Sequence, residues 1–181
     1  MDKKTLRKKA YKYYEQMSDD IYLNRNKEIL EYIVNDERFL NSKKVALYYP
    51  IKKEINLLSL MVLFPNKEYF FPRMEGNTLS FRKVTDILEL EDAKFNLKEP
   101  KKTSKIEENI DIYYVPCLLT SGEFRIGYGK GFYDNYFKNH QGFKVGIVHK
   151  KLKNVHAKID EHDIPMDYII WGVKLCMMRL Y

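Results

Sequence analysis

The sequence is poor in the residues that usually cross-link small folds or bind zinc in them. Its 181 residues include two cysteines, Cys117 and Cys176, which lie in apolar segments without metal-ligand spacing. Its four histidines include no pair separated by four residues, the spacing that lets one helix present two ligands to zinc. We therefore predict buried thiols in a reducing compartment, and neither a disulfide framework nor a zinc site.

Long hydrophobic runs are also missing. The longest apolar stretch, residues 57–64, is interrupted by Ser59 and is far shorter than the roughly 20 residues that span a bilayer. The first thirty residues contain no apolar core of a signal peptide, because charged side chains follow Met1 at once. These absences predict a soluble cytoplasmic protein that has no membrane partner.

Positive charge is in excess. The chain carries 32 Lys and Arg residues against 25 Asp and Glu residues, which gives a formal net charge of +7. An anionic partner is therefore expected, and nucleic acid, an acidic membrane surface and a polyanionic small molecule all satisfy the charge. A hydrophobic content of 45% over this length is typical of one globular domain, which we place at residues 1–181.

Helical and strand patterns alternate along the chain. Apolar spacing predicts helices at residues 3–17 and 19–35, the second capped by Ser18 with Ile21 among its inward side chains, and helical structure from Asn56 onward. Short apolar strands are predicted at residues 45–50, 68–73, 78–84, 112–119, 143–148 and 168–171. This order favours a single α/β domain, with a mostly parallel sheet flanked by helices and antiparallel additions around residues 69–84.

The most informative stretch is the glycine loop, Arg125-Ile126-Gly127-Tyr128-Gly129-Lys130-Gly131-Phe132-Tyr133-Asp134, which links a strand to a helix. Alternate glycines let backbone N–H groups approach phosphate oxygens, and Arg125 and Lys130 add full positive charges. Asp134 offers a carboxylate to a divalent metal that bridges the same phosphates. A glycine-rich hairpin needs similar residues, and the spacing matches neither the dinucleotide fingerprint nor the P-loop, but the charged residues favour phosphate binding.

This loop resembles the signature of the 5-formyltetrahydrofolate cyclo-ligases, also called 5,10-methenyltetrahydrofolate synthetases. Other family blocks follow in family order: Lys3-Lys4-Thr5-Leu6-Arg7, Tyr48-Tyr49 with Glu54, Phe71-Pro72-Arg73, and Glu161-His162-Asp163-Ile164-Pro165-Met166-Asp167. The chain departs from the family where Pro116-Cys117-Leu118-Leu119-Thr120 replaces P-G-x-x-F-D, and where Lys158 replaces a proline. Because the matching blocks run from residue 3 to residue 167, the resemblance covers nearly the whole chain despite these two departures.

The resemblance implies a three-layer Rossmann-like fold of the kind found in phosphosugar isomerases and CoA transferases. It also implies closure of 5-formyltetrahydrofolate, in its simple or its polyglutamylated form, to 5,10-methenyltetrahydrofolate with ATP and Mg²⁺, through a phosphorylated formyl group. On this basis the expected catalytic residues are Arg125 and Lys130, and the expected metal ligands are Asp134 and Asp163.

The resemblance further implies two sets of ligand contacts. The ATP contacts are Lys3, Lys4, Thr5, Leu6, Arg7, Arg125, Ile126, Gly127, Tyr128, Gly129, Lys130, Gly131, Phe132 and Tyr133. The folate contacts are Arg7, Tyr49, Glu54, Tyr128, Gly129, Lys130, Gly131 and Phe132.

Two other functions fit parts of the sequence. A nucleic-acid-binding domain would use the same excess of Lys, Arg and Tyr, although the aromatic residues lie mainly in apolar runs and no recognised nucleic-acid motif is present. A sugar-phosphate isomerase would share the fold and a glycine loop, but it would need neither ATP nor a metal. We expect a small-molecule substrate and no nucleic-acid partner.

Overall fold

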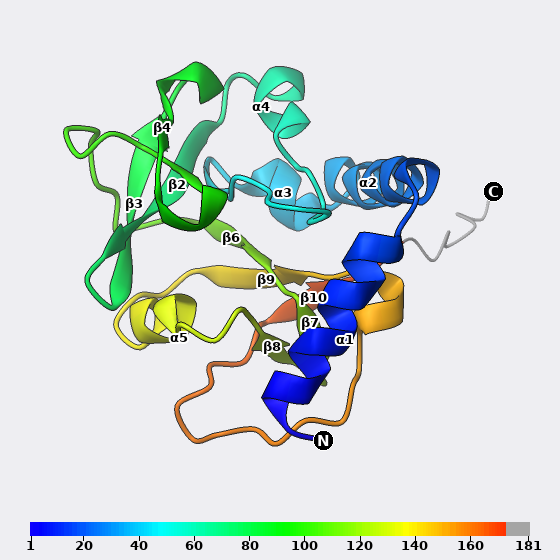
Figure 1. The fold of residues 1–181 in the computed structure, drawn as a ribbon. Helices are drawn as coiled ribbons and strands as arrows, with labels where there is room; N and C mark the ends of the chain where they lie inside the picture. The colour runs from blue at the N-terminus through cyan, green and yellow to red at the C-terminus, as the bar shows by residue number, and fades with distance from the viewer. Residues whose placement is uncertain (173–181) are drawn as a thin grey trace.

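The computed structural model describes residues 1–172, which form an α/β fold around a six-stranded sheet (Figure 1). The strand order is β10-β9-β6-β1-β2-β3, and all neighbours are parallel except β2 and β3. The strands are β1 (Lys44–Ala46), β2 (Glu68–Glu75), β3 (Thr78–Val84), β6 (Ile112–Pro116), β9 (Phe143–Ile147) and β10 (Tyr168–Ile170). The predicted mostly parallel sheet, with its antiparallel addition at residues 69–84, is confirmed.

Helices cover both faces of this sheet. The α-helices are α1 (Lys3–Gln16), α2 (Asp19–Val34), α3 (Glu37–Asn41), α4 (Ser59–Leu63) and α5 (Phe132–Phe137), and the 3₁₀ helices are η1 (Ile87–Glu89), η2 (Lys94–Asn96) and η3 (Lys150–Leu152). Successive strand residues point to opposite faces, so Tyr114 packs with α2, α3 and α4 while Tyr113 packs with α5. The three-layer fold that the resemblance implies is therefore confirmed, and strands that are apolar on both faces explain why helices cover both sides.

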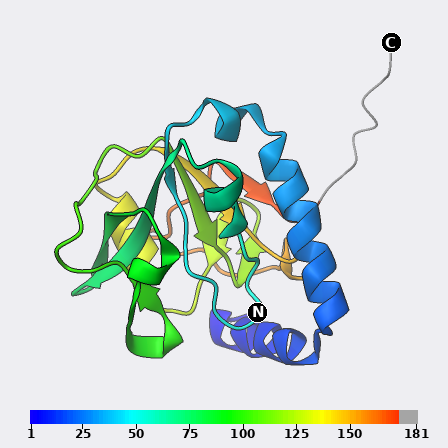
Figure 2. The same ribbon diagram turned by 90° about the horizontal axis from the view of Figure 1, so that it is seen from above.

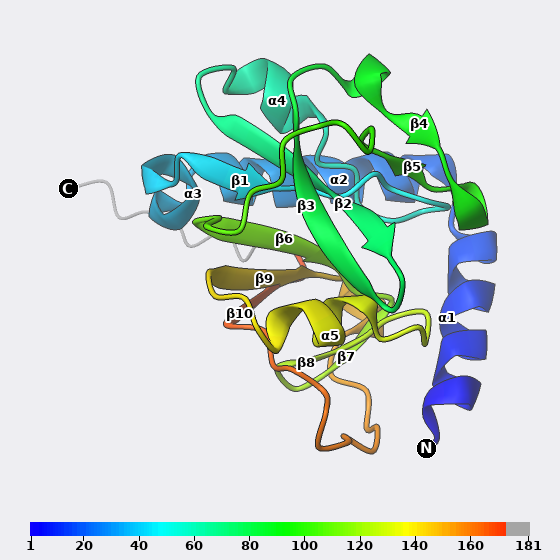
Figure 3. The same ribbon diagram turned by 90° about the vertical axis from the view of Figure 1, so that its left-hand side faces the viewer.

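Helix α1 stands beyond the carboxyl ends of the parallel strands (Figure 3). Asp2 caps it by accepting a hydrogen bond from the Thr5 N–H at 3.0 Å. Its buried stripe includes Leu6 and Ala10, and it packs on Ile126 and on Val148, which follows β9. Figure 2 shows α1 turning directly into α2 at the edge of the molecule. This packing brings the first turns of the chain to the sheet edge where ligands of open α/β folds bind.

Ser18 caps α2 as predicted, because its hydroxyl accepts a hydrogen bond from the Ile21 N–H at 3.3 Å. Ile29 and Ile33 are fully buried against the sheet. The prediction that Ile21 points inward was wrong: its side chain is 46% exposed, because its position on the helix lies off the stripe formed by Ile29 and Ile33. The predicted helix from Asn56 begins only at Ser59, after a turn in which the Asn56 side chain accepts a hydrogen bond from the Leu58 N–H.

Two small hairpins complete the described residues. The predicted strand 112–119 is divided into β6 and β7 (Leu119–Ser121), and β7 pairs with β8 (Phe124–Ile126). In the charged region 85–110, β4 (Glu91–Asp92) pairs with β5 (Lys98–Glu99). Cys117 is buried as predicted, whereas Cys176 lies outside the described residues. No helix in residues 1–172 has the length and apolarity needed to cross a membrane.

Candidate active site

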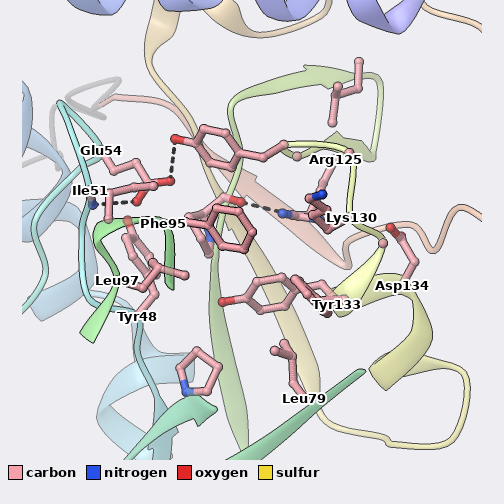
Figure 4. A pocket seen from close by; sticks show the side chains of 18 of the residues that line it. Tyr48, Ile51, Glu54, Leu79, Phe95, Leu97, Arg125, Lys130, Tyr133 and Asp134 are labelled. Carbon is pink, nitrogen blue, oxygen red and sulfur yellow. Dashed lines mark hydrogen bonds between the residues drawn. The ribbon is translucent and has the colours of Figure 1, made fainter. Parts of the chain in front are cut away.

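A cavity of about 530 Å³ opens at the carboxyl ends of the parallel strands (Figure 4). Its lining comes from α1, the loop after β1, the β2–β3 hairpin, the β4–β5 hairpin, the end of β6, the glycine loop with the first turn of α5, and the loop at residues 160–163. Cationic side chains line the part of the cavity formed by α1 and the glycine loop, and aromatic and aliphatic side chains line the part beside β1 and β5. A cavity of this size suits a ligand that has both a charged and an aromatic end.

The backbone of the glycine loop explains its three glycines. Gly129 and Gly131 adopt left-handed conformations, with φ values of 96° and 70°, which other residues adopt only with strain. Gly127 has an ordinary backbone, but a Cβ atom there would lie 2.3 Å from a guanidinium nitrogen of Arg125. Within the described residues, no hydrogen bond uses the N–H groups of residues 127–131 as donors. The loop therefore presents free backbone donors to the cavity.

Two arginines flank this loop. The Arg125 Nε donates to the Pro116 carbonyl at 3.0 Å, and its guanidinium carbon lies 4.7 Å from the centre of the Tyr133 ring. The Arg7 Nε donates to the Gly127 carbonyl at 2.8 Å, which joins α1 to the loop. These contacts use one nitrogen of each guanidinium and leave its remaining donors for an anion.

Glu54 is held at the far side of the cavity. Its carboxylate accepts hydrogen bonds from the Ile51 N–H at 2.9 Å and the Tyr128 hydroxyl at 3.0 Å, and the residue is 4% exposed. Burial raises the pKa of this carboxyl to about 7, although both hydrogen bonds oppose the shift. Glu54 is therefore a hydrogen-bonding group positioned in advance, and not the solvated loop residue that its sequence context alone suggests.

The two predicted metal ligands also line the cavity. One Asp134 oxygen accepts the Ile164 N–H at 3.1 Å. One Asp163 oxygen lies 2.5 Å from the Lys3 ammonium and 2.7 Å from the Asp160 nitrogen. Ligand atoms of Asp160, His162 and Asp163 lie within 4.8 Å of one another. Asp134 is not part of this group, so the described structure gathers Asp163 with Asp160 and His162 and not with the other predicted ligand. The carboxylate oxygens of Asp160 and Asp163 are donors of the kind that fit Mg²⁺.

The predicted N-terminal block does not reach the cavity as a unit. Lys3 and Arg7 line it together with Tyr11, because residues four apart share one helix face. Lys4 and Thr5 are exposed and Leu6 is buried in the core, and none of these three lines the cavity. The other predicted ligand contacts, Tyr49, Glu54 and residues 125–133, all line it.

Sequence reasoning missed the β4–β5 hairpin, to which it assigned no chemistry. Phe95 at its tip is 57% exposed, adopts a left-handed backbone with φ 63°, and lines the cavity together with Leu97. The Lys130 ammonium lies 5.6 Å from the centre of the Phe95 ring, so the hairpin tip meets the glycine loop across the cavity. Region 85–110 lacks periodicity, and the available signal was the resemblance of residues 95–100 to a loop of the cyclo-ligase family, which carried no assigned role.

Comparison with known proteins connects this geometry to one family. The sequence profile of the 5-formyltetrahydrofolate cyclo-ligase family matches residues 1–172. The chain belongs to this family. It is 22% identical to the mouse 5-formyltetrahydrofolate cyclo-ligase over 188 residues, with 93% of each chain covered, and 29% identical to the Mycoplasma genitalium 5-formyltetrahydrofolate cyclo-ligase over 133 residues, with 71% of this chain and 72% of that protein covered.

Solved structures agree with this membership. A 5,10-methenyltetrahydrofolate synthetase from Aquifex aeolicus superimposes with a TM-score of 0.79 at 32% identity, covering 93% of this chain and 89% of that one. The Mycoplasma pneumoniae 5,10-methenyltetrahydrofolate synthetase has the same fold, with a TM-score of 0.75 at 23% identity. The superposition covers 94% of this chain and 98% of that one. The cyclo-ligase family member is therefore an enzyme, and the resemblance inferred from its motifs is confirmed.

Proposed function

We propose that this enzyme converts 5-formyltetrahydrofolate to 5,10-methenyltetrahydrofolate with ATP and Mg²⁺, releasing ADP and inorganic phosphate. The observation that carries the proposal is the cavity, which joins a cationic, N–H-rich loop to a buried carboxylate with aromatic surroundings. Such a cavity places a triphosphate and a pterin ring next to each other, which is the main requirement for transferring a phosphoryl group between them.

The phosphates occupy the glycine-loop end. Arg125 and Lys130 neutralise the charge on the transferred phosphoryl group, and the free N–H groups of residues 127–131 hold its oxygens. Lys3 and Arg7 contact the nucleotide from α1, which lies against the same loop. Where the bound substrates exclude water, these fixed charges would stabilise a transition state more strongly than they would in solution.

The folate occupies the Glu54 end. The Glu54 carboxylate accepts hydrogen bonds from the N–H edge of the pterin, while Tyr49 and Phe95 cover ring faces. The formyl oxygen then points toward the glycine loop, where it attacks the terminal phosphorus of ATP and ADP leaves. N10 of the folate next attacks the activated formyl carbon, the carbon–oxygen bond breaks, and phosphate departs while the N10 proton passes to solvent.

Asp134 and Asp163, which both line the cavity, would hold the magnesium ion, and Asp160 or His162, which are grouped with Asp163, could add a ligand. The bound ion supplies charge neutralisation and alignment of the phosphate oxygens. The Lys3 ammonium lies 2.5 Å from the Asp163 carboxylate, so Lys3 and the ion would share this carboxylate as a partner.

An isotope experiment tests the phosphorylated intermediate. The purified enzyme would be incubated with ATP, Mg²⁺ and 5-formyltetrahydrofolate that carries oxygen-18 in its formyl group, and the released phosphate analysed by mass spectrometry. The proposal predicts one labelled oxygen per phosphate and one phosphate per methenyl product. Unlabelled phosphate alongside methenyl product would contradict transfer to the formyl oxygen, because the phosphoryl group would then have gone to water.

A further inference from the structure

The Tyr133 hydroxyl lies in the cavity without a protein partner. Figure 4 shows its ring crossing the cavity floor, with the oxygen pointing toward the side of Tyr48 and Leu97 and away from Asp134. Among the described residues, no hydrogen bond involves this hydroxyl, although the side chain is half-buried. A polar group in such surroundings is costly unless it meets a ligand or water.

Neighbouring tyrosine hydroxyls are occupied. The Tyr48 hydroxyl donates to the Ile55 carbonyl at 2.6 Å, and the Tyr128 hydroxyl donates to Glu54. On the same helix as Tyr133, the Tyr136 hydroxyl lies 2.9 Å from that of Tyr113. The Tyr133 hydroxyl differs from these three because it has no hydrogen bond among the described residues, a property that it shares with Tyr11 and Tyr49 among the tyrosines of the cavity lining.

The ring of Tyr133 is fixed between the two ends of the cavity. The Arg125 guanidinium lies 4.7 Å from the ring centre on the anion-binding side, and Phe81 packs on it with ring centres 6.4 Å apart. Burial raises the pKa of the hydroxyl, with the charge of Arg125 opposing this shift and that of Glu54 reinforcing it. The group therefore keeps its proton at neutral pH and acts as a hydrogen-bond donor.

We infer that Tyr133 is a catalytic residue: its hydroxyl donates a hydrogen bond to the formyl-derived oxygen as that oxygen leaves with the phosphate. The inference rests on the proposed function. In this step the N10 lone pair forms a bond to the formyl carbon, and the electrons of the carbon–oxygen bond pass to the departing phosphate. Charge grows on that oxygen only as the bond breaks, so a donor placed there favours the transition state over the ground state.

The assignment predicts which of the two chemical steps Tyr133 serves. A donor on the formyl oxygen would make that oxygen a weaker nucleophile toward phosphorus, so the hydroxyl gives no advantage to the first step. It assists the second step, where the same oxygen is the leaving atom. Loss of the hydroxyl should therefore separate ADP formation from methenyl formation in time.

Tyr133→Phe tests this inference, because it keeps the ring on Arg125 and removes only the oxygen. In rapid-quench experiments with ATP, Mg²⁺ and 5-formyltetrahydrofolate, we expect ADP to form in a burst of about one equivalent per site. Methenyl formation should follow about 10- to 100-fold more slowly than in the wild type. Affinities for ATP and folate, measured by calorimetry without the second substrate, should stay within about twofold.

Tyr136→Phe is the matched control, because it removes a hydroxyl from the same helix outside the cavity, and it should keep ADP and methenyl formation synchronous. Methenyl formation at the wild-type rate in Tyr133→Phe, or an equal slowing of both products, would overturn the inference and leave the proposed function intact. A folded wild type that forms no methenyl product would overturn both.

Discussion

At the residue scale, the most informative group is the Glu54 carboxylate. The carboxylate is buried and accepts a hydrogen bond from the N–H of Ile51, three residues earlier in the chain. This bond fixes the loop after β1 around the Glu54 side chain. The second hydrogen bond, from Tyr128, connects this loop to the glycine loop. Burying a charged carboxylate costs folding free energy. Buried carboxyl groups of this kind are common in binding and catalytic sites.

The pKa of Glu54 gives a prediction for stability. Its folded-state pKa of about 7 lies above the ordinary value of 4.5, so the folded protein binds more protons than the unfolded one between these values. The free energy of unfolding should therefore fall as pH rises from 4.5 through 7, by on the order of 3 kcal/mol from this group. Glu54→Gln should remove that fall, as measured by urea unfolding of the ligand-free protein at several pH values.

Glu91→Gln, at an exposed carboxylate of β4, is the control and should leave the pH dependence of the wild type unchanged. Equal slopes for the wild type and Glu54→Gln would show that burial does not raise the Glu54 pKa. The sign of the effect matters, because an ordinary ion-paired carboxylate would lose stability as pH falls.

At the scale of elements, the glycine loop works as a unit with Arg125. Gly127→Ala places a Cβ atom 2.3 Å from the guanidinium, which is flexible and will move away. We expect little loss of stability but at least about tenfold weaker ATP binding, or about 1.4 kcal/mol, because the proposed function makes the displaced guanidinium a phosphate ligand. Isothermal titration with ATP and Mg²⁺ measures the change.

Gly122→Ala, in the β7–β8 turn, should behave in the opposite way. Its φ of 58° strains any other residue, while no atom lies within 4 Å of the new Cβ. It should lower the free energy of unfolding by about 1 kcal/mol and leave ATP affinity unchanged. If both variants affected ATP binding equally, Arg125 would not be the group that Gly127 accommodates.

The β4–β5 hairpin brings Phe95 to the cavity from the least regular part of the chain. Phe95→Ala should raise the KM for 5-formyltetrahydrofolate about 2- to 10-fold and change the KM for ATP little, because aromatic packing contributes about 0.5–1.5 kcal/mol. Steady-state kinetics with each substrate varied in turn measures this. Leu88→Ala, at an 88% exposed side chain of η1, is the control; an unchanged folate KM in Phe95→Ala would exclude ring contact.

At the scale of the whole molecule, apolar periodicity was enough to predict the sheet, α1 and most of α2. The residue types and spacing of residues 125–134 match a phosphate-binding task, whereas Glu54 was predicted only through the family resemblance, because its local context is that of a solvated loop residue. Phe95 and Tyr11 could not be predicted, since the first depends on an irregular hairpin and the second on where α1 docks. The segment around Cys117, which departs from the family pattern, is still joined to the sheet and to the glycine loop. The Cys117 N–H donates to the Ile147 carbonyl, and the Arg125 side chain donates to the Pro116 carbonyl.

The net charge of +7 gives a prediction about nucleic acid. If the basic surface serves a small anionic substrate, oligonucleotides should bind weakly, without sequence preference, and with an affinity that falls steeply with salt. Fluorescence anisotropy with labelled DNA and RNA at several salt concentrations measures this. Tight, sequence-selective binding at physiological salt would instead support a second, nucleic-acid function.

The central claim is that the glycine loop and Arg125 drive ATP-dependent closure of a formylated folate. The most direct measurement follows the methenyl-folate absorbance of purified wild type and Arg125→Ala with 5-formyltetrahydrofolate and Mg²⁺, with and without ATP. We predict an increase that requires ATP in the wild type and is lost in the variant, with both proteins equally folded by circular dichroism. An increase without ATP, an undiminished increase in Arg125→Ala, or no increase in the folded wild type would contradict the claim.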